Sequence, residues 1–368
     1  MSINSHANRD DRGNSRRPGP PTARPSRRAA LRLALLAPGW PAIARGSPDA
    51  FPTRVRAFRL IEADGLRRDT YPIHTTIEGA GRDTRFLLLR DGQPIVAQFR
   101  PIDGPNHDVA LDFEASLDSR DTRRYEVHSG QGVDPGPDPG AGIRLERVGD
   151  HFQVTQPTGM AFRLGRDLFD GPGPLVEAGS PRLAFVGAAG TSVGVEVGRD
   201  KAPIDLRSGR PPRVEITRQG PLAVVARVEA GPFEGGNGSA TLDLTFPRGK
   251  PWVEAVLTLD DPRKVVTGLQ FALGLAFDPD PSRTSPAGDW ARVDDAHRSV
   301  IAAAAGGGNV AVERKQIVIR RDFEPSQASK SLTFRVLFGS RSGPLGRISP
   351  DAMIHPPRVE WDRPRAEP

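Results

Sequence analysis

Short runs in which apolar and polar residues alternate are the feature of this sequence that most constrains its fold. In residues 239–246 the apolar side chains occupy every second position, as Ala240, Leu242, Leu244 and Phe246. Successive side chains of a β-strand point to opposite faces, so this pattern predicts strands with one buried and one largely polar face. No stretch of twelve or more residues shows a convincing helical period. The sequence therefore predicts a nearly all-β protein.

Turn-forming residues separate the predicted strands and divide the chain into regions. With 40 Gly and 37 Pro among 368 residues, the strands are expected to be short and joined by turns. Residues 54–131 predict a small N-terminal β-sandwich. Residues 132–142, with the sequence GVDPGPDPGAG, predict a linker, because their prolines and glycines hold neither a ladder nor a helix. Residues 143–345 predict a larger antiparallel sandwich, and residues 346–368 a Pro-rich tail.

The first 44 residues differ from the rest of the chain in charge. They contain eight Arg and two Asp, which equals the formal net charge of +6 of the whole chain. Residues 45–368 therefore hold 43 basic and 43 acidic residues. A neutral remainder lacks the positive field on which binding to a phosphate backbone relies, so we expect no nucleic-acid partner.

Residues 1–44 also show the order of an export signal. After a polar, Arg-rich start that is typical of disorder, Ser26-Arg27-Arg28 precedes the short apolar run 33–36 and the small residues 42–44. This order resembles a twin-arginine signal peptide; the alternative is a disordered basic tail. No segment of the chain approaches the ~20 apolar residues of a membrane-spanning helix. We therefore expect a signal peptide that is removed near Ala44, no membrane span, and a periplasmic or secreted mature protein.

The order of strands in the second region is similar to that of a known family. Three segments carry the resemblance: Val148-Gly149-Asp150 at the end of a predicted strand, Gly220-Pro221 before an apolar strand, and Lys250-Pro251-Trp252-Val253 at the start of the next. Over roughly residues 54–275 the chain resembles the exo-rhamnogalacturonan lyase-like family. The resemblance implies a small N-terminal β-sandwich, then a larger galactose mutarotase-like antiparallel supersandwich, with a sugar polymer as ligand. Lyases of this family add a helical toroid that this chain does not show, so no catalytic residue is carried over.

Metal and cofactor chemistry finds little support in the sequence. The chain has no cysteine, which excludes disulfides, thiolate metal sites and a cysteine nucleophile. Five acidic residues could supply oxygen ligands for calcium, but their spacing fits no EF-hand loop and is ordinary for loops. They are Asp278, Asp280, Asp289, Asp294 and Asp295. We assign no metal site and expect no cofactor.

Acid–base catalysis on a sugar requires an acid and a base that converge on one bond, and the sequence ties no such pair together. The candidates are His107, His151 and His297 with Glu177, Glu254 or Asp289. All are single residues in predicted loops or strand ends, for which the alternative is a solvated side chain. The catalytic residues and the enzymatic activity therefore stay unassigned.

The polar positions of three consecutive predicted strands form the candidate ligand-binding surface. If these strands pair in register, one face carries Arg227, Glu229, Asp243, Trp252 and Glu254. A Trp flanked by carboxylates and an Arg can stack on a sugar ring and hydrogen-bond its hydroxyls. The alternative is a face covered by another part of the protein, with Trp252 in the core.

These observations predict an exported carbohydrate-binding or polysaccharide-processing accessory protein whose partner is a polysaccharide or oligosaccharide, acidic sugars included. Two alternatives remain open. One is a sugar-active enzyme, either a polysaccharide lyase or a mutarotase- or epimerase-like enzyme, that acts on the sandwich. The other is a non-catalytic structural envelope protein.

Overall fold

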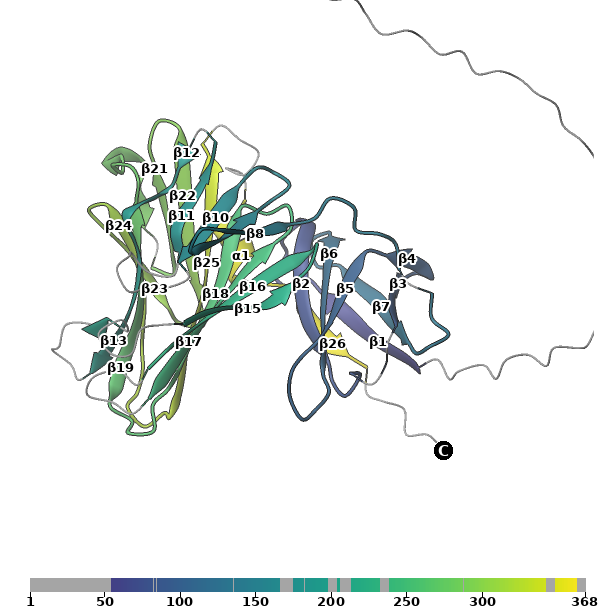
Figure 1. Ribbon diagram of the computed structural model, residues 1–368. Helices are drawn as coiled ribbons and strands as arrows, with labels where there is room; N and C mark the ends of the chain where they lie inside the picture. The colour runs from purple at the N-terminus through teal and green to yellow at the C-terminus, as the bar shows by residue number, and fades with distance from the viewer. Residues whose placement is uncertain are drawn as a thin grey trace, which may run out of the picture. The chain divides into compact units, whose positions relative to one another are not determined.

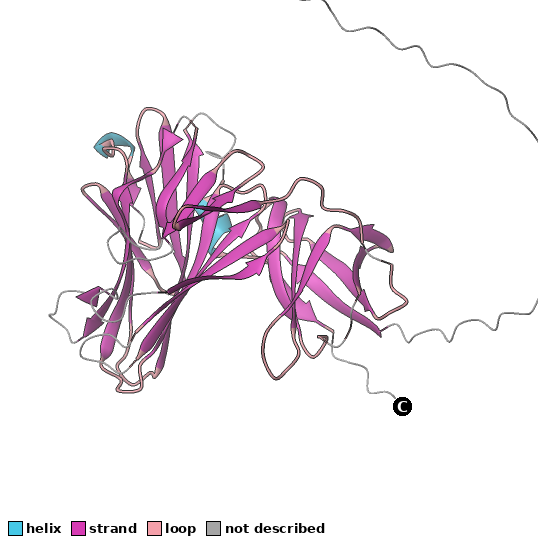
Figure 2. Ribbon diagram, in the orientation of Figure 1, coloured by secondary structure: helices cyan, strands magenta, loops and turns pink. Residues whose placement is uncertain are grey.

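The computed structural model describes residues 54–362, apart from residues 82, 84, 135, 166–174, 182, 198–203, 206–212, 232–237, 287 and 342–347. The predicted leader, residues 1–44, lies outside this part of the chain. The described residues belong to one compact unit, and nearly all of their regular structure is β-strand (Figure 2). The helices of the described residues are a 3-10 turn, η2 (Pro281–Arg283), and the short α1 (Pro350–Ile354). The prediction of an all-β fold is confirmed.

The N-terminal region folds into two antiparallel sheets (Figure 1). The strand order is β26-β1-β7-β3-β4 in one sheet and β2-β6-β5 in the other. The bounds are β1 Arg54–Ile61, β2 Arg68–Ile77, β3 Phe86–Arg90, β4 Gln93–Ile95, β5 Ala97–Pro101, β6 Val109–Leu117, β7 Thr122–Ser129 and β26 Arg358–Trp361. Phe58, Phe113 and Tyr125 fill the space between the sheets, with ring centroids 5.1 to 5.9 Å apart.

The Pro-rich C-terminal segment contributes to this N-terminal region. Ser349 begins α1 by accepting a hydrogen bond from the backbone N–H of Asp351. Strand β26 then pairs antiparallel with β1, so that Trp361 lies opposite Phe58 with the ring centroids 4.7 Å apart. A strand of four residues beside prolines is too short to show an alternating pattern, and the sequence therefore predicts only a Pro-rich tail here.

The larger region contains three antiparallel sheets. Their strand orders are β15-β16-β17-β18-β25-β22-β21-β20, β14-β13-β19-β24-β23 and β12-β11-β10-β9-β8. The bounds are β8 Arg144–Val148, β9 His151–Thr155, β10 Ala161–Gly165, β11 Leu175–Ser180, β12 Leu183–Ala184, β13 Val186–Val197, β14 Ile204–Asp205, β15 Arg213–Gln219, β16 Ala223–Ala230, β17 Ser239–Pro247, β18 Trp252–Asp260, β19 Val266–Leu275, β20 Ser285–Pro286, β21 Trp290–Asp294, β22 Arg298–Ala305, β23 Asn309–Glu313, β24 Gln316–Asp322 and β25 Ser329–Ser340.

One face of the eight-stranded sheet packs into the main core. The predicted meander of β15, β16, β17 and β18 forms consecutive neighbours in this sheet, as the alternating pattern indicates. Leu257 and Leu259 of β18 are fully buried, and they belong to the same apolar cluster as Phe271 of β19 and Phe162 of β10. All three sheets of the larger region therefore share one core.

Part of the opposite face of the eight-stranded sheet is covered by the N-terminal sandwich. A second apolar cluster unites Trp252, Ile301 and Leu337 of the large sheet with Tyr71 of β2 and Met353 of α1. Ile301 lies on strand β22. The buried contact also brings polar residues of the two sandwiches together. Arg218 of β15 lies beside Asp112 of β6, and Glu254 of β18 lies near His74 of β2.

Candidate functional site

Three of the five residues predicted for a sugar-binding face lie together on the outer face of the large sheet. Arg227 of β16 is the cross-strand partner of Asp243 of β17, and its guanidinium donates two hydrogen bonds to that carboxylate, at 2.8 and 2.9 Å. Glu229 lies two residues farther along β16, opposite Thr241, and is exposed. The guanidinium of Arg227 is therefore already hydrogen-bonded to the carboxylate of Asp243. A ligand contact of these three residues stays a prediction.

The other two predicted residues, Trp252 and Glu254 of β18, lie under the N-terminal sandwich. Trp252 is only 2% exposed, and its ring centroid is 5.8 Å from that of Tyr71. The indole Nε1 donates to Glu254 Oε1 at 3.1 Å, and Arg335 donates to Glu254 Oε2 at 3.1 Å. This is the covered arrangement that the sequence analysis left open as the alternative. The stacking of Trp252 on a sugar stays a prediction. The structure shows no exposed face of the indole ring that would support it.

The acidic residues considered for calcium pair with cations of their own neighbourhood. The ion pairs are Asp278–Lys315 at 2.6 Å, Asp280–Arg283 at 3.0 Å, Asp294–Arg292 at 3.0 Å and Asp295–Arg298 at 2.6 Å. Asp289 is exposed. Across the described ranges, no three His, Cys, Asp or Glu side chains come close enough together to hold a metal ion.

The three histidines considered for acid–base catalysis lie at separate places in the described part of the chain. His107 is an exposed loop residue between β5 and β6, and His151 begins β9. His297 is exposed in the turn before β22, where its backbone N–H donates to Asp295 Oδ1 at 2.7 Å. The side chain of Glu177 lies outside the described residues. No acid–base pair of the predicted kind is assembled from these candidates.

A buried polar network that the sequence analysis missed lies where the N-terminal sandwich meets the large sheet. Asp112 Oδ1 accepts from Arg218 Nη1 at 2.6 Å and lies 2.7 Å from His74 Nδ1, while its Oδ2 accepts from Gln98 Nε2 at 3.2 Å. Burial lowers the pKa of His74, but the hydrogen bond with Asp112 and the charge of Glu254 outweigh burial, so that this pKa lies above its ordinary value. His74 and Asp112 occupy polar positions of predicted strands, but only the pairing of β2 with β6 makes them partners.

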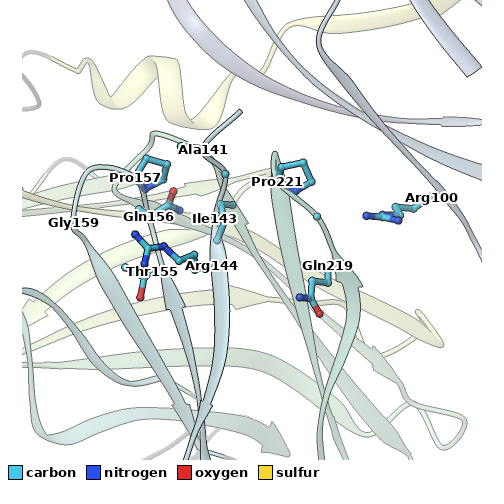
Figure 3. Close-up of a pocket in the computed structure, with 12 residues that line it drawn as sticks. Arg100, Ala141, Ile143, Arg144, Thr155, Gln156, Pro157, Gly159, Gln219 and Pro221 are labelled. Atoms are coloured by element: carbon cyan, nitrogen blue, oxygen red, sulfur yellow. The ribbon is translucent and has the colours of Figure 1, made fainter. Parts of the chain in front are cut away.

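An open pocket of about 820 Å³ lies beside this network (Figure 3). Its walls come from the linker end and the start of β8, with Arg144, from the end of β9, with Thr155, and from the end of β15, with Gln219, and Pro221 beyond it. Arg100 of β5 adds a side chain of the N-terminal sandwich. The volume lies within the ~300–1,000 Å³ of ordinary ligand pockets.

The pocket walls are held by close backbone contacts. The backbone N–H of Ile143 donates to the carbonyl of Pro221 at 3.2 Å. Gly142 is required beside this contact, because an added Cβ would lie 2.5 Å from the Cα of Pro221. On the other side, Gln156 is 2% exposed and its amide binds the backbone of the β17–β18 turn, at Pro247 and Gly249. These contacts therefore fix the position of the linker end, which forms one wall of the pocket.

The chemistry of the pocket is cationic and hydrogen-bonding. Figure 3 shows Arg100 on one side of the Gln219–Pro221 segment and Arg144, beside Thr155, on the other. Neither guanidinium has a hydrogen bond or ion pair with another side chain in the described ranges. The described lining residues include no His, Asp, Glu, Lys or Tyr. Such a lining can bind an anion and hydroxyl groups.

No described helix is both long and apolar enough to cross a membrane.

The sequence matches no protein-family model, and it matches no curated protein at a significant level. The resemblance to the exo-rhamnogalacturonan lyase-like family is therefore not supported by a family model and stays an expectation.

Solved structures show weak similarity. An α-mannosidase from Enterococcus faecalis V583 has a TM-score of 0.45 and 8% identity over 80% of this chain and 44% of that one. A glycosyl hydrolase family 38 protein from Enterococcus faecalis has a TM-score of 0.41 and 8% identity over 80% and 45%. The α-N-acetylgalactosaminidase NagBb from Bifidobacterium bifidum, in complex with GalNAc, has a TM-score of 0.34 and 9% identity over 53% and 36%. This chain spans less than half the length of each, and similarity at this level assigns neither family nor activity.

Proposed function

We propose that this protein is an exported carbohydrate-binding protein, and that the pocket between Arg100 and Arg144 binds an acidic oligosaccharide. The observation that carries the proposal is that two guanidinium groups, without a side-chain partner among the described residues, line one pocket of about 820 Å³. A guanidinium binds a carboxylate with two parallel, charge-assisted hydrogen bonds. The side chains of Gln219 and Thr155 supply donors and acceptors for sugar hydroxyls.

Binding without catalysis is the version of this function that the lining favours. Cleavage of a uronate polymer by β-elimination requires a base for the C5 proton and an acid for the leaving oxygen. The described lining has neither, although its arginines could neutralise the sugar carboxylate. The export part of the proposal rests on the order of residues in the leader.

The test is calorimetric titration of the mature protein with a galacturonate oligosaccharide and with a neutral glucan oligosaccharide of equal length. We expect binding of the acidic sugar and much weaker binding of the neutral one. Arg100→Gln and Arg144→Gln should each lower the affinity by about 10- to 150-fold, because each removes a charge-assisted contact of about 1.5–3 kcal/mol.

Arg213→Gln is the matched control, since Arg213 is a highly exposed arginine at the far end of β15 from the pocket. It should leave the affinity unchanged. Equal affinity for the acidic and neutral sugars, or equal losses in Arg213→Gln and the two pocket variants, would refute the proposed site.

A further inference from the structure

One wall of the pocket, residues 220–222, is hydrogen-bonded to a buried amide side chain that is not itself part of the described lining. Gln98 of β5 is 4% exposed, and its Oε1 accepts from the backbone N–H groups of Leu222 and Ala223, at 2.9 and 3.3 Å. The same amide lies so close to Gly220 that a Cβ there would be 2.1 Å from Gln98 Oε1. Gln98 therefore determines where the segment of Gly220, Pro221 and Leu222 lies.

The orientation of Gln98 depends in turn on Asp112. The carboxylate of Asp112 is 1% exposed and accepts from Gln98 Nε2 through Oδ2. An amide group can be turned over, and this bond, together with the bond from Nε2 to the carbonyl of Ala223 at 3.4 Å, keeps Oε1 toward the N–H groups of the pocket wall. The other carboxylate oxygen, Oδ1, is shared by Arg218 and His74.

His74 is the group of this network that changes charge near neutral pH. The charged groups that face it are Asp112 on β6, Arg218 on β15 and Glu254 on β18, with Glu254 Oε1 at 4.0 Å from Nε2. Arg335 on β25 in turn neutralises Glu254. With His74 protonated, the Asp112 carboxylate is in contact with two cations, the imidazolium and the Arg218 guanidinium; with His74 neutral, Arg218 is the one cation that remains in contact with it.

We propose that Gln98 and Asp112 are positioning residues for the pocket wall, and that protonation of His74 holds this wall in its ligand-binding position. The ligand part of this inference rests on the proposed function, whereas the positioning of the wall does not.

The direction of the pH effect follows from the sign of the shift. The pKa of His74 is raised above about 6.5 in the folded protein. The stabilisation by the charged pair is therefore complete below about pH 6.5 and is lost as the pH rises through the folded-state pKa. A uronate carboxylate of the ligand stays ionised between about pH 6 and pH 9. A pH-dependent affinity in this window that is absent from His74→Gln therefore identifies His74 as its source.

The first measurement needs no ligand. Hydrogen exchange of the Leu222 and Ala223 amides, corrected for the intrinsic effect of pH, should show protection that falls about fivefold between about pH 6 and pH 9. In His74→Gln, whose amide can still donate to Asp112, this change should vanish. Amides of β19, which lies in another sheet, serve as the internal control. Protection that is independent of pH in the wild type, or equally pH-dependent in His74→Gln, would overturn the inference.

The second measurement is the affinity for the galacturonate oligosaccharide across the same pH range. The wild type should bind about fivefold more weakly at the alkaline end, and His74→Gln should bind with one affinity throughout. His297→Gln, at an exposed histidine, should behave as the wild type. If the wild type binds at every pH with one affinity, the coupling to the ligand is wrong. If it binds at no pH, the proposed function fails, and the exchange measurement alone decides the positioning of the wall.

Discussion

Replacement of Trp252 by alanine separates a core role from a ligand-binding role of this residue. The indole is 2% exposed, packs on Tyr71 and donates a hydrogen bond to Glu254. A large-to-small change in a packed core costs about 3–5 kcal/mol of the free energy of unfolding. We expect a loss in this range, because the variant removes both the aromatic contact and the ring that fills the cluster between the two sandwiches.

Trp252→Phe is the matched variant, since it keeps most of the buried ring but loses the Nε1–H donor. It should cost about 1.5–3 kcal/mol, the value for a hydrogen bond to a charged group. Urea unfolding followed by circular dichroism measures both losses. A loss below about 1 kcal/mol for Trp252→Ala, together with loss of sugar binding, would refute the core assignment and restore the predicted stacking role.

Three further predictions concern stability, export and chemistry. Lys330→Met leaves the carboxylate of Asp261 buried without the ammonium that lies 2.7 Å away, and should lower the free energy of unfolding in urea by about 3–5 kcal/mol. The double variant with Asp261→Asn should recover part of this loss. Equal stability of Lys330→Met and the double variant would contradict the reasoning. Changing Arg27 and Arg28 to Lys should retain the precursor inside the cell, as immunoblots of cell fractions would show, and unchanged export would exclude the twin-arginine interpretation. Purified mature protein should release no unsaturated uronate ends from rhamnogalacturonan or related polymers, because no acid or base lines the described pocket; a steady rise in their absorbance would instead support the enzyme alternative.

The strands of the large sheet were predictable because apolar side chains alternate with polar ones along each strand, and the apolar side chains are the buried ones. In β18 the apolar positions Val253, Ala255, Leu257 and Leu259 are all buried, as alternation requires. Strand β26 was not predictable, because its stability comes from pairing with β1, about 300 residues earlier in the chain. A short segment among prolines has no local pattern that could reveal such a partner.

The polar sites could be predicted only in part, because they too depend on contacts between segments that are distant in sequence. Alternation places Arg227 and Asp243 on one face, and the observed register makes them partners. Alternation does not say what covers that face, so the burial of Trp252 under the N-terminal sandwich could not be decided. Arg100 and Arg144 lie on strands of different sheets, and only the folded chain brings them to one pocket.

A crystal structure of the mature protein with a bound galacturonate oligosaccharide would locate the binding site. We expect sugar carboxylates within about 3 Å of the guanidinium groups of Arg100 and Arg144, with sugar hydroxyls near Gln219. Electron density for the sugar over Arg227, Glu229 and Asp243 instead, with the pocket empty, would refute the proposed pocket and favour the outer face of the large sheet as the binding site.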